Sequence, residues 1–282
     1  GAVAESIRNI VAVGASPLAL TDCLNYGNPE NPDVFWTFEE GVRGIGEAAK
    51  ALSFIDGEPV PIVSGNVSFY NESKGGNAVV PSPVIMSVGR VHSALSVCTM
   101  QLKKEDSQLV FMGYPTEDFV GTEFGRALEA LGKPVPGYSP YLDLAKEAKQ
   151  NRCVHEAIVA GLVLSCHDVS GGGLWQCVAE MALGERGKGN IGVHLNLEEN
   201  IALEALLFSE SGGYVLEVAN NNLDDFLSKA DAQGVSLYRM GHTKAVPVMT
   251  VTYNETLQFE LPIRSLKSSW NKQNLSHPGT PV

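Results

Sequence analysis

The sequence is short of positive charge and of long apolar runs. Its 282 residues hold 20 lysines and arginines against 32 aspartates and glutamates, a net charge of −12. Such an acidic chain is a poor match for a nucleic-acid surface, although backbone amides and Mg²⁺ can still hold phosphate groups. No stretch reaches the roughly 20 apolar residues that a membrane-spanning helix needs. We therefore expect neither a nucleic-acid partner nor a membrane partner.

Cysteine is sparse and shows no pairing pattern. The five cysteines are scattered, without a Cys-x-x-Cys motif: Cys23, Cys98, Cys153, Cys166 and Cys177. An odd number at irregular spacing argues against a disulfide framework and favours reduced thiols in the cytoplasm. The run Cys166-His167-Asp168 has the residue types of a thiol nucleophile, but a small buried thiol on a strand is the favoured interpretation.

The first third of the chain has patterns typical of a sheet covered by helices. At 44% hydrophobic and 18% charged residues, the composition is that of a globular protein with one large or two modest domains. Thr37 and Glu40 form a capping-box pattern before an apolar stripe, which predicts a helix over 37–52. Another helix is predicted over 4–13. The predicted strands cover 16–22, 61–70 and 83–91.

From residue 107 onward, strand and helix patterns alternate, which indicates an α/β (α+β) fold. Strands are expected at 107–112, 162–168, 191–197, 213–218, 235–241 and 247–253. Helices are expected at 122–131, 140–160, 174–183, 222–232 and 263–272. Residues 92–107 would connect the two parts of the chain.

Two polar stretches carry the residues that could hold a ligand. In residues 61–72, PIVSGNVSFYNE, an apolar run ends at Ser64-Gly65. Gly65 lets backbone approach a ligand closely, Asn66 offers a hard oxygen suited to Mg²⁺, and Ser68 offers a hydroxyl. In residues 18–30, LALTDCLNYGNPE, Asp22 follows an apolar run and could face a ligand or metal. Each stretch alone is also compatible with a strand end and a polar turn.

Taken together, LTDCLNYGNPE and the later SGNVSFYNE resemble the C-terminal half of phosphoribosylformylglycinamidine synthase in its small-subunit form. The resemblance extends over nearly the whole chain. It implies membership of the aminoimidazole ribonucleotide synthetase-like (PurM-like) ATPases. In that family the matching aspartate and second-motif glycine contact ATP, the asparagine binds Mg²⁺ and the serine contacts substrate. These roles would fall on Asp22, Gly65, Asn66 and Ser68. No residue of the chain is assigned a catalytic role.

The family also implies a domain plan. Residues 1–95 would form an N-terminal sheet domain that pairs into a barrel, residues 96–265 a C-terminal α/β domain, and residues 266–282 a closing helix and tail. Another half of similar design would precede this one and contain the catalytic histidine. The isolated chain is therefore expected to be inactive and to pair with itself as a homodimer.

The activity that the resemblance implies is an ATP-dependent, C–N-forming ligase reaction of purine biosynthesis. Formylglycinamide ribonucleotide would be converted to the amidine with ammonia from glutamine, using ATP and Mg²⁺. The expected partners are the N-terminal half of the same subunit, the glutaminase subunit PurQ and the small subunit PurS. Two alternatives remain: another ATPase of the superfamily, or a non-catalytic half that completes the barrel.

Residues 167–174, HDVSGGGL, form a further motif that resembles the family. Its glycine-rich turn between strand and helix could hold an anion. His167, Asp168 and Glu210 are interpreted as remnants of a pseudo-symmetric second site. The favoured alternative is that these residues satisfy turns and strand ends. No role is assigned to His92, His155, His194, His242 or His277, because their spacing matches no metal-binding motif.

Overall fold

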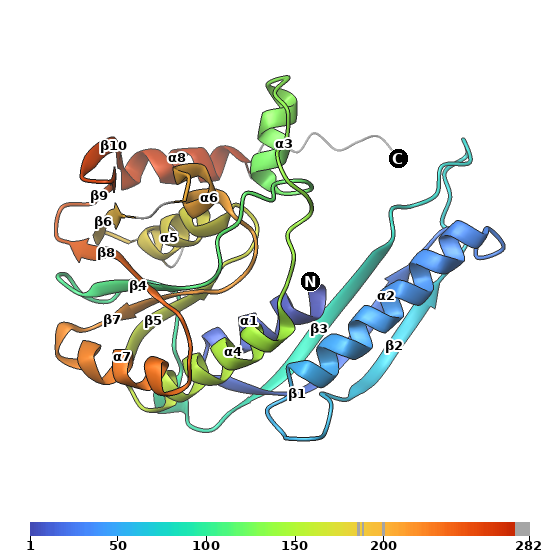
Figure 1. The fold of residues 1–282 in the computed structure, drawn as a ribbon, viewed down its shortest axis with the longest axis horizontal. Helices are drawn as coiled ribbons and strands as arrows, with labels where there is room; N and C mark the ends of the chain where they lie inside the picture. Colours follow the sequence, from blue (N-terminus) through green and yellow to red (C-terminus); the bar gives the residue numbers. More distant parts are fainter. Residues whose placement is uncertain (185–186, 188, 199–200, 274–282) are drawn as a thin grey trace. The chain divides into compact units, whose positions relative to one another are not determined.

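A computed structural model describes residues 1–184, 187, 189–198 and 201–273 (Figure 1). The chain divides into two compact units. The first comprises Gly1–Val97 together with Leu142–Glu156, and the second comprises Cys98–Tyr141 and the described residues from Ala157 on. The expected boundaries at 95 and 265 stay a prediction, but the structure adds a segment of a later helix to the first unit.

The first unit is a three-stranded sheet with helices on one face (Figure 1). Its strand order is β2-β1-β3, with β2 parallel and β3 antiparallel to β1. Its elements are α1 (Ala2–Ala12), β1 (Ala15–Asn25), α2 (Pro32–Ala51), β2 (Ile62–Ser68), β3 (Ser82–Val91) and most of α4 (Leu144–Val159). The predicted helices and strands of this region are confirmed, with different ends.

The start of α2 is a correction. Helix α2 begins at Pro32, because the Asn31 side chain accepts a hydrogen bond from Asp33 N and a proline fits the first helical position. Thr37 instead lies inside the helix, where its hydroxyl donates to Val34 O, so the predicted capping box is wrong. Strand β2 lies within the predicted range of 61–70 and continues through Gly65.

The two faces of the small sheet differ. Along β3, Val84, Met86 and Val88 are 58%, 60% and 50% exposed, whereas Ser87 donates to Ser6 of α1 at 2.7 Å. Since side chains alternate along a strand, α1 covers one face and an apolar row lies open on the other. The expected pairing into a barrel is not tested by the single chain.

Helix α4 is fixed to the first unit by a buried ion pair. Arg8 Nη1 of α1 lies 2.8 Å from Glu147 Oε1, with side chains only 6% and 3% exposed. Further along α4, Arg152 donates to Ser53 O at 2.8 Å and pairs with Asp56. Removing one partner of a buried pair is costly, because the other charge is left uncompensated. This explains why α4 groups with residues distant in sequence.

The second unit is a seven-stranded sheet with order β10-β9-β6-β8-β4-β7-β5. Its strands are β4 (Gln108–Met112), β5 (Val163–Asp168), β6 (Gly192–Leu197), β7 (Tyr214–Val218), β8 (Tyr238–Lys244), β9 (Val248–Tyr253) and β10 (Thr256–Pro262). Its helices are α3 (Glu123–Ala130), α5 (Gly173–Leu183), α6 (Leu203–Phe208), α7 (Leu223–Ala232) and α8 (Ile263–Gln273). The predicted elements are present; α6 and β10 were not predicted.

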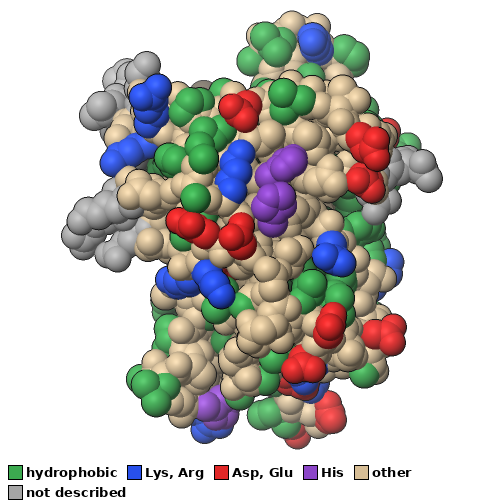
Figure 2. Space-filling view, turned by 90° about the vertical axis from the view of Figure 1, so that its left-hand side faces the viewer, with side chains coloured by type: hydrophobic (Ala, Val, Ile, Leu, Met, Phe, Trp, Pro, Cys, Tyr) green, Lys and Arg blue, Asp and Glu red, His purple; other side chains and the backbone are tan. Residues whose placement is uncertain are grey.

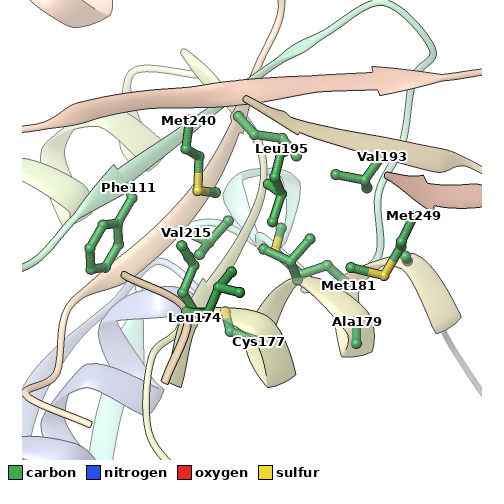
Figure 3. Packing of buried hydrophobic residues seen from close by; sticks show 14 of the residues in the cluster. Phe111, Leu174, Cys177, Ala179, Met181, Val193, Leu195, Val215, Met240 and Met249 are labelled. Carbon is green, nitrogen blue, oxygen red and sulfur yellow. The ribbon is translucent and has the colours of Figure 1, made fainter. Parts of the chain in front are cut away.

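The core of the second unit lies between the sheet and α5. Side chains of the strands point toward those of the helix, as Figure 3 shows for Leu195 and Val215 on one side and Leu174 and Met181 on the other. Almost all of these side chains are inaccessible to water, which is the main favourable contribution to folding. Among the described residues, none of the helices is both long and apolar enough to cross a membrane.

A buried carboxylate fixes the connection into this sheet. Glu217 of β7 is fully buried; its Oε1 accepts from Lys104 N and Ser107 Oγ, and its Oε2 accepts from Lys103 N and Ser165 Oγ. All four distances lie between 2.7 and 2.9 Å. These donors compensate the cost of burying the charge.

On the face shown in Figure 2, Lys and Arg side chains are interspersed with Asp and Glu and form no continuous basic patch.

Candidate functional site

Parallel pairing of β1 with β2 places Asp22 and Gly65 side by side as register partners. A Cβ added to Gly65 would lie 2.7 Å from the carboxyl carbon of Asp22, closer than side-chain carbons approach in practice. Glycine is therefore needed for the Asp22 carboxylate to lie over this strand. Within the described residues, no hydrogen bond or ion pair engages that carboxylate.

Asn66 and Ser68 lie on the same strand but face the other way. Asn66 pairs with Cys23 and Ser68 with Asn25, one and three positions beyond the Asp22–Gly65 pair. Because strand side chains alternate, Asn66 and Ser68 share the open face, and Asp22 and Gly65 share the opposite face. Helix α1 packs against β1 and β3 on that opposite face, whereas β2 itself is exposed from Ile62 to Val67. The predicted common direction of Asn66 and Ser68 agrees with this alternation. The four residues are neighbours, but they do not form one surface.

A further residue, Asn71, holds the end of β2 in place. Its amide nitrogen donates to Tyr26 O at 3.0 Å and to Ser68 O at 2.9 Å, and its carbonyl oxygen accepts from Ser68 Oγ at 3.2 Å. The Ser68 hydroxyl thus has its proton engaged and keeps its lone pairs for a ligand. The sequence shows Asn71 in the same motif but gives no sign of this role.

Tyr26 anchors the same region through aromatic contacts with α2. Its side chain is fully buried and meets the Phe38 ring edge-on, with ring centroids 5.3 Å apart. Phe69, which follows Ser68, packs against Phe38 at 5.1 Å. These aromatic contacts tie the motif after β1 and the motif after β2 to α2, so that both candidate stretches are held by one helix.

The donor set can be tested against Mg²⁺, which prefers oxygen ligands in octahedral geometry. Asn66 is exposed and presents one amide oxygen, and no described residue hydrogen-bonds its side chain. Groups of three or more His, Cys, Asp or Glu side chains that could hold a metal are absent from the described part of the chain. Asn66 therefore fits a Mg²⁺ ion whose other ligands are phosphate oxygens and water. The described residues around Asn66 do not supply enough ligands to bind the ion by themselves.

In the second unit, His167 lies between two carboxylates. Its Nδ1 is 3.2 Å from Asp168 Oδ1 and its Nε2 is 2.9 Å from Glu180 Oε2. Burial lowers the imidazole pKa, but hydrogen bonds to and charges of Asp168 and Glu180 outweigh it, and the pKa rises from 6.5 to about 9. The imidazolium in turn lowers the pKa of Glu180. Glu180, on α5, was not identified from the sequence, because the helix brings it back to β5.

Glu210 occupies the glycine-rich turn. Its Oε1 accepts hydrogen bonds from Gly172 N at the start of α5 and from Glu123 N at the start of α3, each at 2.8 Å. A carboxylate at two helix N-termini is favourable, because the helix dipoles and free amides meet a negative charge. The chain's own side chain thus fills the predicted anion cradle. This geometry favours the interpretation that Glu210 satisfies a turn.

Cys166 does not have the surroundings of a reactive thiol. All five cysteines are free thiols, and burial raises the pKa of Cys166 well above its usual value, so its thiolate is not available at neutral pH. The interpretation of Cys166 as a buried structural thiol is thereby supported. His277 lies outside the described residues.

Two family models match the chain. Residues 1–91 match the N-terminal domain of AIR synthase related proteins, and residues 123–254 match the C-terminal domain of the same proteins. The matched ranges contain Asp22, Gly65, Asn66 and Ser68 in the first case and His167, Asp168 and Glu210 in the second.

Curated relatives are phosphoribosylformylglycinamidine synthase subunits PurL. The chain is 40% identical to that of Methanothrix thermoacetophila over 246 residues, covering 85% of the chain and 31% of the relative. It is 36% identical to that of Moorella thermoacetica over 272 residues, covering 96% of the chain and 35% of the relative. The chain therefore spans about a third of the length of these relatives.

Solved structures share the fold. T. maritima PurL complexed with FGAR aligns with a TM-score of 0.70 at 19% identity, covering 94% of the chain and 42% of that structure. A HypE–HypF complex aligns with a TM-score of 0.66 at 15% identity, covering 92% of the chain and 81% of that structure. At these identities the likeness establishes the two-domain α/β architecture and leaves the chemistry to the residues.

Proposed function

The chain belongs to the AIR synthase related protein family, and from this we propose that it is one half of an ATP-dependent synthase that converts formylglycinamide ribonucleotide to formylglycinamidine ribonucleotide. The relatives that it matches over most of its length are PurL subunits of phosphoribosylformylglycinamidine synthase. The observation that carries the proposal is the pairing of Asp22 with Gly65, because it brings the two motifs together on adjacent strands.

The proposed reaction joins carbon to nitrogen. The amide oxygen of the substrate attacks the γ-phosphorus of ATP, ADP leaves, and an iminophosphate forms. Ammonia derived from glutamine adds to the activated carbon, and phosphate leaves with the former amide oxygen. The products are the amidine, ADP and phosphate. Electrostatic stabilisation of the transferring phosphoryl group is the main demand on the protein.

We assign the roles by face of the sheet. Asp22 and Gly65 would position ATP on the face of β2 opposite to Asn66, which is exposed at this strand, and Ser68 would orient the substrate from the open face. Asn66 would supply one oxygen to Mg²⁺, which neutralises phosphate charge when bound. Since β2 is an outer strand of its sheet, a phosphate chain could pass its exposed edge to reach Asn66.

The site is tested by titrating Mg·ATP into the complete subunit by calorimetry. Asp22→Ala should weaken Mg·ATP binding at least tenfold, because it removes the carboxylate that would contact ATP. Among the described residues no side chain or backbone group engages that carboxylate, so it is available for the ligand. Asp33→Ala, in the first turn of α2, is the matched control with a carboxylate removed elsewhere. Equal affinity of the Asp22 variant and the parent would refute the assignment.

A second candidate function is that this half acts by completing a barrel. The open apolar row Val84, Met86 and Val88 favours it, because exposed apolar faces of this kind usually meet a partner. The partner would be the N-terminal half of the same subunit, with PurQ and PurS bound to the assembled enzyme. This function and the ATP site are compatible in the complete protein.

For the isolated chain, the proposal predicts no amidine formation with ATP, substrate and ammonia, and a two-fold dimer through the open face. The dimer should bury at least about 2,000 Å² in total, as obligate interfaces do. Light scattering at micromolar protein concentration measures the oligomeric state of the isolated chain. A stable monomer would remove the argument for barrel completion, and turnover by the isolated chain would remove the need for a second half.

A further inference from the structure

Where β9, β6 and β8 lie side by side, the seven-stranded sheet has a polar face opposite the core. Along β6, Val193, Leu195 and Leu197 belong to the apolar cluster, so the intervening His194 and Asn196 lie on the other side. The same alternation holds in β9, where Met249 and Val251 are in the cluster and Thr250 and Thr252 are not. Histidine side chains gather near the middle of the face that Figure 2 shows.

Two histidines meet on this polar face. His194 of β6 and His242 of β8 are direct register partners in an antiparallel pair, and their ring centroids are 5.3 Å apart with an interplanar angle of 64°. Both side chains are half-buried. Residues directly opposite on neighbouring strands are held at close range by the backbone, so the two imidazoles stay close without further help.

A chain of hydrogen bonds fixes the tautomer of His194. Asn196 Nδ2 donates to Glu198 Oε1 at 2.8 Å, which orients the amide so that its oxygen accepts from Thr252 Oγ1 at 2.7 Å. The Thr252 hydroxyl has only one proton, so at its contact with His194 Nε2, 3.1 Å away, it accepts. His194 therefore carries its proton on Nε2, and Nδ1 has the free lone pair.

We propose that His194 and His242 bind a divalent transition-metal ion such as Zn²⁺ through their imidazole nitrogens. Neutral imidazole is a preferred ligand of Zn²⁺, Cu²⁺ and Ni²⁺, whereas Mg²⁺ prefers oxygen. Metal-binding histidines commonly donate their second N–H to a hydrogen-bond acceptor, as His194 does to Thr252. With two protein ligands, the remaining positions are filled by water. The site is independent of the proposed synthase activity.

The neighbouring lysine does not leave an uncompensated positive charge beside the pair. Lys244 Nζ donates to Thr250 Oγ1, and Thr250 Oγ1 donates to Glu260 Oε2 at 3.0 Å. The Glu260 carboxylate therefore lies one hydroxyl away from the ammonium group and reduces its repulsion of a cation. Glu198, at the end of the hydrogen-bond chain, adds a second negative charge on this side.

The test is Zn²⁺ titration by calorimetry at pH 8, using protein without a histidine tag and with Cys23→Ser to remove the half-buried thiol. One Zn²⁺ should bind, and Mg²⁺ should give no heat. His194→Ala and His242→Ala should each weaken Zn²⁺ binding at least tenfold. Thr252→Val should weaken Zn²⁺ binding about tenfold, because valine cannot accept the hydrogen bond that keeps the His194 proton on Nε2. Thr252→Ser keeps the hydroxyl and should bind Zn²⁺ like the parent.

His92→Ala is the matched control, because His92 also lies near a second histidine, His155, with ring centroids 6.0 Å apart. It should bind Zn²⁺ like the parent. Circular dichroism checks that each variant is folded, and His242→Asn replaces His242→Ala if the alanine variant is not. Zn²⁺ binding that is unchanged in both His194 and His242 variants, or absent up to millimolar Zn²⁺, would overturn the proposal.

Discussion

The His167 cluster predicts a defined dependence of stability on pH. His167 is 15% exposed and is bound by Asp168 on its own strand and by Glu180 on α5. Replacing it by glutamine keeps a polar side chain of similar length but removes the titrating imidazole. Because the cluster joins β5 to α5, its contribution should appear in the free energy of unfolding of the second unit.

The sign follows from proton linkage. The pKa of His167 rises from 6.5 to about 9 on folding, so the folded state binds the proton more tightly than the unfolded state. The stabilisation is therefore fully present below about pH 6.5 and is lost as pH rises through about 9. At about 1.4 kcal/mol for each pH unit, the difference corresponds to on the order of 3 kcal/mol.

The assay is urea unfolding followed by tryptophan fluorescence, since Trp175 of α5 packs against the core of the second unit. The difference in free energy of unfolding between the parent and His167→Gln should be larger at pH 6 than at pH 10 by about 3 kcal/mol. His92→Gln serves as the control for replacing a histidine in the first unit. Parallel pH profiles of parent and His167→Gln would refute the reasoning.

Further predictions concern single positions. In the complete enzyme, Asp22→Ala and Asn66→Ala should each lower kcat/KM by on the order of 100-fold, and Asn66→Asp should retain more activity because a carboxylate is also a hard ligand; near-normal steady-state kinetics in folded alanine variants would contradict both roles. Gly65→Ala should displace the Asp22 carboxylate and weaken Mg·ATP binding, measured by calorimetry, at least tenfold. Gly44→Ala is the control, because its added Cβ meets no atom within 4 Å. It should leave Mg·ATP binding unchanged and raise the free energy of unfolding by roughly 0.5–1 kcal/mol. Glu217→Gln should destabilise the second unit by about 2 kcal/mol or more in urea unfolding, because an amide NH₂ cannot accept the hydrogen bonds that one carboxylate oxygen receives; an unchanged midpoint would show that the amide is accommodated.

Local sequence determined most of the elements and the family. Short stretches rich in apolar residues predicted the strands around Leu109, Leu195 and Val251, because a strand needs only a few residues to bury its side chains. Long ordered motifs containing Asp22 and Asn66 identified the family, since such words depend only on residue order. The ends of elements were less well determined, as at α2, where Asn31 caps the helix in place of Thr37.

Only the tertiary structure decided which distant residues meet and which way they face. Parallel pairing of β1 with β2 placed Asp22 over Gly65, and alternation then turned Asn66 to the opposite face. Contacts between non-adjacent strands and helices depend on register and sheet order, which no local pattern encodes. For this reason no role could be assigned to His194 and His242 from sequence alone, since they become neighbours only when β6 pairs with β8.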